Sequence, residues 1–221
     1  MLLFNERADV ARYARRMVRD GLVVGTSGNV SLRVGDLVAV TPSGLDYEEL
    51  APELVTVCDL AGERVEGPLE PTSELPMHLA VYANTEDHAV VHTHSTAATV
   101  VSTLVDELPS VHYLVALFGG PIRVTDYATF GTPQLAENMV KALQGRRGCI
   151  LGNHGTITIG EDLAKAYSLS LYLEWLCEVW LRATAAGTPR LLPPEEVERV
   201  RRKVASYGQT PPKPADPKEA R

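Results

Sequence analysis

Two histidines separated by one residue, His92 and His94, end a short apolar run that predicts a strand over 89–92. Side chains at positions i and i+2 of a strand point to the same side, so both imidazoles project together from the strand end. Such a pair is a common platform for two ligands of a metal ion. The motif is short, and taken alone it also fits two partly buried histidines that hydrogen-bond locally.

Two further residues could complete a metal site. His154 lies in the sequence GNHG between two predicted strands, where the glycines indicate a tight turn that exposes the imidazole. Glu74 lies in PTSE at the start of a predicted helix. Each also has an ordinary interpretation, as a turn histidine and as a carboxylate that favours the helix dipole. Together with His92 and His94 they offer three nitrogens and a carboxylate, which suit Zn²⁺ or another borderline divalent ion and leave room for a substrate.

Three loops carry neutral hydrogen-bond donors. They contain the sequences GTSGN at 25–29, TPSG at 41–44 and TS at 72–73. Their hydroxyls and backbone N–H groups can bind a phosphate, above all beside a helix N-terminus, although each loop is also typical of an ordinary turn. The sequence has no GxxxxGK[ST] and no GxGxxG motif, so we expect neither a P-loop nor a dinucleotide cofactor.

Composition places the chain among ordinary globular proteins. It has 221 residues, of which 45% are hydrophobic and 22% charged, and this excludes wholesale disorder, collagen and a coiled coil. The length suits one large domain. The formal charge of −7 makes a general nucleic-acid binder a poor interpretation, because neutralising phosphates requires a surplus of Lys and Arg.

Cysteine usage and the first residues indicate a compartment. The three cysteines are odd in number and widely spaced, without a CxxC motif, which favours a reducing environment over a disulfide framework. The beginning MLLFNERADVARYARR lacks the apolar stretch of a signal peptide. No run of about 18 apolar residues exists. We therefore expect a cytoplasmic protein without a membrane span.

Periodicity and turn signals predict helices and short strands in mixed order. The expected helices are 6–20, 73–84 with Ser73 as N-cap, 95–105, 133–144, 161–186 and 195–206. The expected strands are 29–34 and 37–40 as a hairpin, then 54–58, 89–92, 121–124, 149–151 and 156–159. The hairpins argue against strict βαβ alternation. We predict a single α/β domain over 1–209, with a central antiparallel or mixed sheet flanked by helices, and a disordered Pro-rich tail over 210–221.

The motifs occur in a recognisable order. Along the chain they read GTSGNVS, TPSG, PTSE, HTH, HY, YATFGT, NHG and SYG. As an ordered set over roughly residues 5–208, they resemble the class II aldolase/adducin-type family, and in particular its L-fuculose-1-phosphate aldolase branch. The resemblance implies a central antiparallel sheet and a C4 homotetramer.

The same resemblance implies a set of site residues. It implies one Zn²⁺ per subunit, held by Glu74, His92, His94 and His154, with Glu74 also moving a proton. It implies that Tyr113, Phe130 and Tyr207 approach the site from a neighbouring subunit or from the C-terminal part of the chain. The implied phosphate pocket, with Thr26 added from the first loop, comprises Thr26, Gly28, Asn29, Ser43, Gly44, Thr72 and Ser73.

The expected reaction is reversible aldol cleavage of a sugar 1-phosphate of the L-fuculose 1-phosphate type. Its products are dihydroxyacetone phosphate and a short aldehyde such as L-lactaldehyde. A Schiff-base lysine is not expected, because Lys141 and Lys165 fall on predicted solvated helix faces. The alternatives are an L-ribulose-5-phosphate 4-epimerase and a sugar-phosphate decarboxylase or dehydratase. A non-enzymatic adducin-like interaction domain is disfavoured, because all four expected metal ligands are present.

Overall fold

The computed structural model describes residues 1–204, so Tyr207 and the predicted tail 210–221 lie outside the described residues. The helices are α1 Phe4–Arg19, η1 Tyr47–Glu49, η2 Pro52–Leu54, α2 Leu75–Asn84, α3 Thr96–Val101, η3 Tyr113–Phe118, α4 Pro133–Leu143, α5 Leu163–Ala186 and α6 Pro194–Val204. The strands are β1 Asn29–Val34, β2 Leu37–Val40, β3 Thr56–Asp59, β4 Arg64–Glu66, β5 Ala89–Thr93, β6 Glu107–Leu108, β7 Ile122–Arg123, β8 Gly148–Leu151 and β9 Gly155–Gly160.

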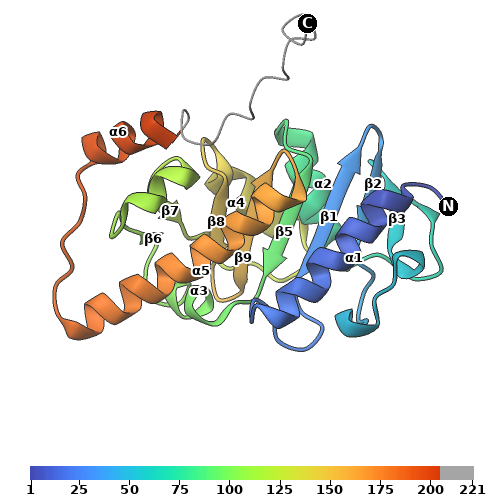
Figure 1. Ribbon diagram of the computed structural model, residues 1–221, viewed down its shortest axis with the longest axis horizontal. Helices are drawn as coiled ribbons and strands as arrows, with labels where there is room; N and C mark the ends of the chain where they lie inside the picture. Colours follow the sequence, from blue (N-terminus) through green and yellow to red (C-terminus); the bar gives the residue numbers. More distant parts are fainter. Residues whose placement is uncertain (205–221) are drawn as a thin grey trace, which may run out of the picture.

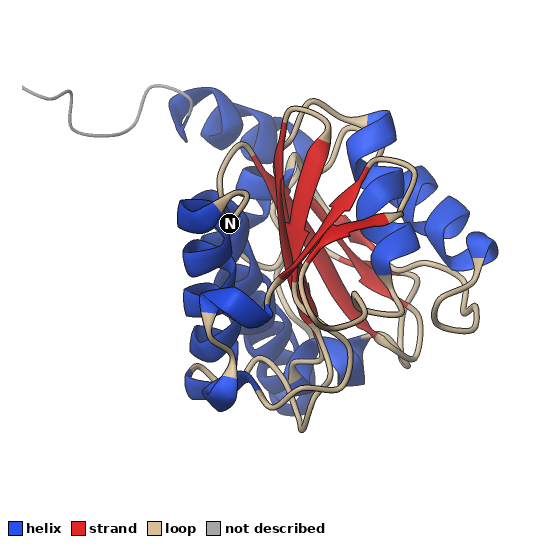
Figure 2. Cartoon of the chain, turned by 90° about the vertical axis from the view of Figure 1, so that its right-hand side faces the viewer, coloured by secondary structure: helices blue, strands red, loops and turns tan. Residues whose placement is uncertain are grey.

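A seven-stranded sheet in the order β4-β3-β2-β1-β5-β9-β8 forms the middle of the molecule. Neighbouring strands in it pair antiparallel, and β6 and β7 form a separate two-stranded sheet. Helices lie on both sides of the main sheet (Figures 1 and 2). The predicted α/β architecture with a central antiparallel sheet is therefore confirmed.

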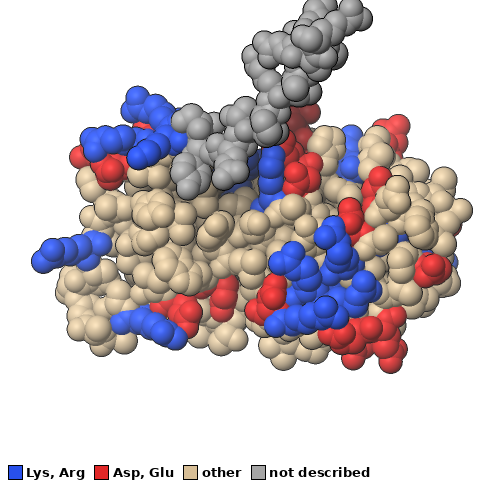
Figure 3. All heavy atoms as spheres, viewed as in Figure 1, with Lys and Arg blue, Asp and Glu red and all other residues tan. Residues whose placement is uncertain are grey.

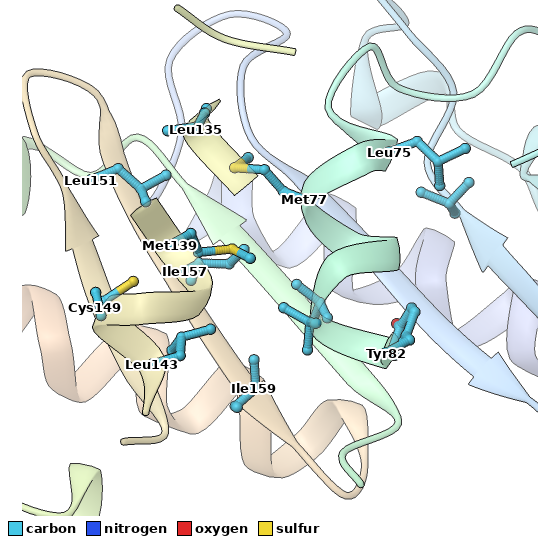
Figure 4. Close-up of a cluster of buried hydrophobic side chains, with 14 of the residues drawn as sticks. Leu75, Met77, Tyr82, Leu135, Met139, Leu143, Cys149, Leu151, Ile157 and Ile159 are labelled. Carbon is cyan, nitrogen blue, oxygen red and sulfur yellow. The ribbon is translucent and has the colours of Figure 1, made fainter. Parts of the chain in front are cut away.

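Each face of the sheet buries its own apolar cluster. On one face, α1 and the first turns of α5 pack against Val30 and Val91. On the other, α2 and α4 pack against Val90 and Ile157 (Figure 4). Since alternate residues of a strand face opposite sides, residues 90 and 92 point toward α2 while residues 91 and 93 point toward α5. This alternation decides which side of the sheet carries the polar residues at the end of β5.

Local signals place several helix ends as predicted. Thr132 caps α4 by accepting a hydrogen bond from the backbone N–H of Leu135, and Pro133 is its first residue. Gly21, with a φ of 69°, follows α1. The predicted N-cap of the second helix is wrong: α2 begins one residue later than a Ser73 cap requires, with Glu74 as the cap residue and no side-chain cap hydrogen bond. The Glu74 carboxylate is engaged elsewhere.

The surface seen in Figure 3 has no single charge sign. Arginine side chains gather over α1, with acidic side chains beside them, and a largely uncharged area separates them from the charged residues over α6. Both lysines considered above, Lys141 and Lys165, are exposed, as predicted. Within residues 1–204, we find no helix with the length and apolar character needed to cross a bilayer.

Candidate active site

Strand pairing brings together residues from three segments at one end of the sheet. In the β1–β5 pair Asn29 lies opposite His92, and in the β5–β9 pair His92 lies opposite Ile157. Directly paired residues share a face of the sheet, so Asn29 and His92 both face α2. Glu74, the residue before α2, meets them there: its Oε2 atom lies 2.9 Å from Asn29 Nδ2 and 3.1 Å from His92 Nε2.

Three imidazoles and one carboxylate converge at this place. Each of Glu74, His92, His94 and His154 offers one ligand atom, and these atoms lie within 4.8 Å of one another. The Nε2 atoms of His92 and His94 are 2.9 Å apart, and His154 Nε2 is 3.2 Å from Glu74 Oε1. The structure therefore groups all four residues that the sequence offers as metal ligands.

The hydrogen bonds of this cluster fit a bound cation. Nδ1 of His92 lies 2.8 Å from the carbonyl oxygen of Thr156, which can only accept, so Nδ1 carries the proton. A neutral His92 then presents the Nε2 lone pair to the cluster, the arrangement found in metal-bound histidines. Oε1 of Glu74 is buried without a hydrogen-bond partner among the described residues. A cation between these atoms would satisfy the converging lone pairs.

Electrostatics in the cluster favour a positive ion. Burial opposes ionisation of Glu74, but the adjacent His92, His154 and Asn29 together hold its pKa well below the usual range. Burial and the neighbouring His92 and His154 lower the pKa of His94 to about 3, so that its imidazole is neutral. Burial also opposes protonation of His92, yet the Glu74 carboxylate raises its pKa overall. The ionised carboxylate thus favours positive charge beside it, whether from a proton or from a metal ion.

Two glycines allow backbone segments to approach the cluster closely. A Cβ on Gly155 would lie 2.1 Å from the carbonyl oxygen of Thr93, so only glycine lets β9 begin directly beside β5. Gly28 has a φ of +73°, and a Cβ there would lie 2.8 Å from the carbonyl oxygen of His92. Its own carbonyl accepts a 2.5 Å hydrogen bond from the Tyr47 hydroxyl. Gly28 therefore has a structural role at this position.

A cavity of about 370 Å³ opens onto the cluster. Glu74, His94, His154 and Phe130 line it, while His92 lies behind them and is fully buried. Every residue of the predicted phosphate pocket also lines it: Thr26, Gly28, Asn29, Ser43, Gly44, Thr72 and Ser73. None of the lining residues in the described part of the chain is Lys or Arg. An anionic substrate would therefore meet neutral donors on one side and the cluster on the other.

The three predicted aromatic residues are placed differently. Phe130 lines the cavity rim with Tyr127, and both rings are largely exposed. Tyr113, in η3, is half exposed and packs against His112 with ring centroids 4.4 Å apart, but it does not line the cavity of its own chain. Tyr207 lies outside the described residues.

Sequence reasoning missed the residues behind the cavity. Ser31, His78 and Tyr82 are buried, the Ser31 hydroxyl is hydrogen-bonded to both of the others, and His78 contacts Asn29. A signal was available: positions 74, 78 and 82 repeat every four residues, which places polar groups on one face of an otherwise apolar helix. Tyr47 and Asn153, which also line the cavity, carried no comparable signal.

Comparison with known proteins gives consistent matches. The model of the family described as class II aldolase and adducin N-terminal domain matches residues 8–181. A 5-deoxy-D-ribulose 1-phosphate aldolase of Bacillus thuringiensis serovar kurstaki is 41% identical over 95% of this chain and 100% of its own. An L-fuculose phosphate aldolase of Escherichia coli K12 is 40% identical over 87% of this chain and 90% of its own. A solved L-fuculose 1-phosphate aldolase superposes with a TM-score of 0.88 at 37% identity, covering 91% of this chain and 96% of that one.

Proposed function

The chain belongs to the class II aldolase and adducin N-terminal domain family and is a class II aldolase, and we propose that it reversibly cleaves a ketose 1-phosphate to dihydroxyacetone phosphate and a short aldehyde. The observation that carries this proposal is the meeting of Glu74 and three histidines with hydroxyl-bearing loops around one cavity. An aldol reaction of a phosphorylated ketose needs both parts, because the carbonyl must be polarised while the phosphate is held.

The names of the relatives support a narrower substrate class. L-Fuculose 1-phosphate and 5-deoxyribulose 1-phosphate, the substrates in the relatives' names, are both terminally deoxygenated ketoses, so cleavage of either releases an aldehyde that ends in a methyl group. The rings of Phe130 and Tyr127 at the cavity rim offer apolar surface to such an end. We propose a 5- or 6-deoxyketose 1-phosphate as the substrate, with L-fuculose 1-phosphate and 5-deoxyribulose 1-phosphate as the two compounds to test first.

The metal in this proposal is Zn²⁺, one per subunit, held by Glu74, His92, His94 and His154. Three imidazole nitrogens and one carboxylate oxygen are ligands that zinc commonly takes. When bound, the ion supplies Lewis-acid polarisation of the ketone.

The chain's own residues would move the protons. In the synthetic direction Glu74, kept ionised by its neighbours, removes a proton from the hydroxymethyl carbon of dihydroxyacetone phosphate. As the carbon–carbon bond forms, Tyr113 gives a proton to the aldehyde oxygen. Because Tyr113 lies outside its own cavity and is half exposed, it would act in the site of a neighbouring subunit of a homotetramer.

The phosphate would be bound by the loops around Thr26, Ser43 and Ser73. These residues are exposed at the cavity wall, where hydroxyl and backbone N–H groups can donate to phosphate oxygens. Asn29 has one amide hydrogen committed to Glu74, so that only its second hydrogen is available to a ligand.

The deciding experiment is a cleavage assay on the purified protein loaded with Zn²⁺. Release of dihydroxyacetone phosphate is followed by coupled reduction, with L-fuculose 1-phosphate and 5-deoxyribulose 1-phosphate as substrates. L-Ribulose 5-phosphate is run in parallel, with its 4-epimer as the product sought. Turnover of a deoxyketose 1-phosphate supports the proposal. Epimerisation of L-ribulose 5-phosphate without any cleavage activity would replace it.

A further inference from the structure

Five buried side chains, from β1, α2 and the residue before α2, form one continuous series of hydrogen bonds behind the cavity. The Tyr82 hydroxyl lies 2.5 Å from Ser31 Oγ, which lies 2.6 Å from His78 Nδ1. Nε2 of His78 lies 2.5 Å from Asn29 Oδ1, and Asn29 Nδ2 donates over 2.9 Å to Glu74 Oε2. Each of the five residues is buried, and Ser31 and His78 are fully so. The chain thus ends on the carboxylate of the cluster.

The hydrogen bonds alternate between side chains of the helix and of the strand because the two elements have similar repeat distances. Four residues of an α-helix rise about 6 Å, and two residues of a strand rise about 6.7 Å. Positions 74, 78 and 82, which run from the residue before α2 along the helix, therefore advance in nearly the same steps as positions 29 and 31 along β1. Where the two elements pack side by side, each strand side chain fits between two from the helix.

Each of these hydrogen bonds can be assigned one donor and one acceptor without conflict. The Glu74 carboxylate accepts from Asn29 Nδ2, so Asn29 Oδ1 faces His78 and must accept from Nε2–H. Burial lowers the pKa of His78 to about 3, so the ring is neutral and has only that one N–H. Its Nδ1 must then accept from the Ser31 hydroxyl, which in turn accepts from Tyr82.

We propose that His78, oriented by Ser31 and Tyr82, is a positioning residue that fixes the Asn29 amide and thereby aims the Glu74 carboxylate at the histidine cluster. The inference rests on the role proposed for Glu74. Asn29 holds Oε2, while Oε1 has no hydrogen bond within the described residues and lies 3.2 Å from His154 Nε2. If His78 lost its N–H, the amide could turn its oxygen toward the carboxylate, and two acceptors would then repel each other.

The test uses two pairs of variants in the full-length, Zn²⁺-loaded protein. His78→Leu removes both ring nitrogens, whereas His78→Gln keeps a donor that can reach Asn29. Ser31→Ala breaks the chain in the middle. Its matched control is Ser170→Ala, because Ser170 is equally buried and makes a 2.6 Å hydroxyl contact with Thr158 that does not lead to the site.

We expect kcat to fall about 10- to 100-fold in His78→Leu and to a smaller extent in Ser31→Ala, with KM little changed. Zn²⁺ affinity, measured by competition with a chelator, should weaken in His78→Leu. His78→Gln should recover most of both quantities. Ser170→Ala should lower Tm as Ser31→Ala does but leave kcat unchanged.

A further variant separates positioning from general packing. In a Glu74→Ala background, His78→Leu should no longer alter Zn²⁺ affinity, since the effect travels through the carboxylate. Unchanged kcat in a folded Ser31→Ala protein, or equal kcat losses in Ser31→Ala and Ser170→Ala, would overturn the inference. If His78→Leu does not fold, the comparison of Ser31→Ala with Ser170→Ala is the deciding test. Failure of the wild-type protein to cleave any ketose 1-phosphate would instead count against the proposed function. The Zn²⁺ measurements remain decisive for His78 in that case.

Discussion

Nδ2 of Asn29 donates a 2.9 Å hydrogen bond to Oε2 of Glu74, although the two residues are 45 positions apart in the sequence. The side chain that the sequence assigns to phosphate binding therefore also holds the carboxylate assigned to proton transfer. This double engagement changes what substitutions at the phosphate loops should do.

Asn29→Leu and Ser73→Ala should differ in their kinetic effects. Ser73 lines the cavity but makes no hydrogen bond to the cluster within residues 1–204, so Ser73→Ala should raise KM for a phosphorylated substrate with little change in kcat. Asn29→Leu should lower kcat as well, because Glu74 loses its buried donor. Steady-state kinetics on a phosphorylated substrate and its unphosphorylated analogue measure both effects. Equal KM increases on the two substrates in Ser73→Ala would show that Ser73 only maintains the turn.

Removing a histidine of the cluster should remove the metal. His94→Ala deletes one of four ligand atoms that lie within 4.8 Å of one another, and we expect loss of both bound Zn²⁺ and turnover. Elemental analysis after dialysis gives the metal content per chain. His88→Ala is the control, since His88 is an exposed histidine outside the cluster. Full activity of the metal-free wild-type protein would refute the metal site.

Glu74→Gln should separate proton transfer from metal binding. The amide keeps an oxygen that can face the cluster but cannot accept a proton at neutral pH, so kcat should fall about 10²- to 10⁴-fold. Most of the bound metal should remain. The check combines kcat with metal content and with hydrogen exchange of dihydroxyacetone phosphate, followed by NMR in deuterated water. Exchange at the wild-type rate in Glu74→Gln would assign the proton transfer to another group.

Tyr113→Phe should slow the step at the aldehyde oxygen and spare proton exchange on dihydroxyacetone phosphate. The phenol of Tyr113 carries an O–H group that can donate to the aldehyde oxygen. Mixing Glu74→Gln chains with Tyr113→Phe chains tests whether the site is shared, because some mixed oligomers then contain one intact site. Regained turnover in verified mixed oligomers is the expected result. Its absence would place both residues in the site of one chain or remove Tyr113 from the mechanism.

The three cysteines should be unreactive in the native protein. All are buried, and burial raises the pKa of Cys58 to about 11 and raises that of Cys149 and Cys177 as well. Thiols that stay protonated below pH 9 are poor nucleophiles. A thiol reagent at pH 8 should therefore label the native chain slowly and the denatured chain at three positions. Rapid inactivation that a substrate prevents would place a cysteine in the site.

Local sequence patterns were sufficient for several parts of the fold. The Thr132-Pro133 start of α4 depends on contacts within a few residues. The convergence of His92 and His94 is also local, although β5 ends at Thr93 and His94 lies just beyond it. The apolar spacing along residues 161–186 also predicts one buried face, formed by Leu163, Ala166, Ser170, Leu173, Cys177 and Trp180. The first five are buried in α5, and Trp180 is partly buried. Such features follow from backbone geometry that neighbouring residues determine.

Tertiary packing decided what the polar side chains at the site contact. The sequence predicts Glu74 as a carboxylate at the start of a helix, with Ser73 as the N-cap. In the structure α2 packs against β1, so that Glu74 contacts Asn29 and His92 instead. His78 falls within the predicted helix 73–84, but no motif in the sequence singled it out. It became a buried hydrogen-bonding group only because β1 places Ser31 and Asn29 opposite it. Hydrogen bonds between residues more than 40 positions apart depend on how the helix and the sheet dock, and the burial of large apolar faces sets that docking rather than the polar residues themselves.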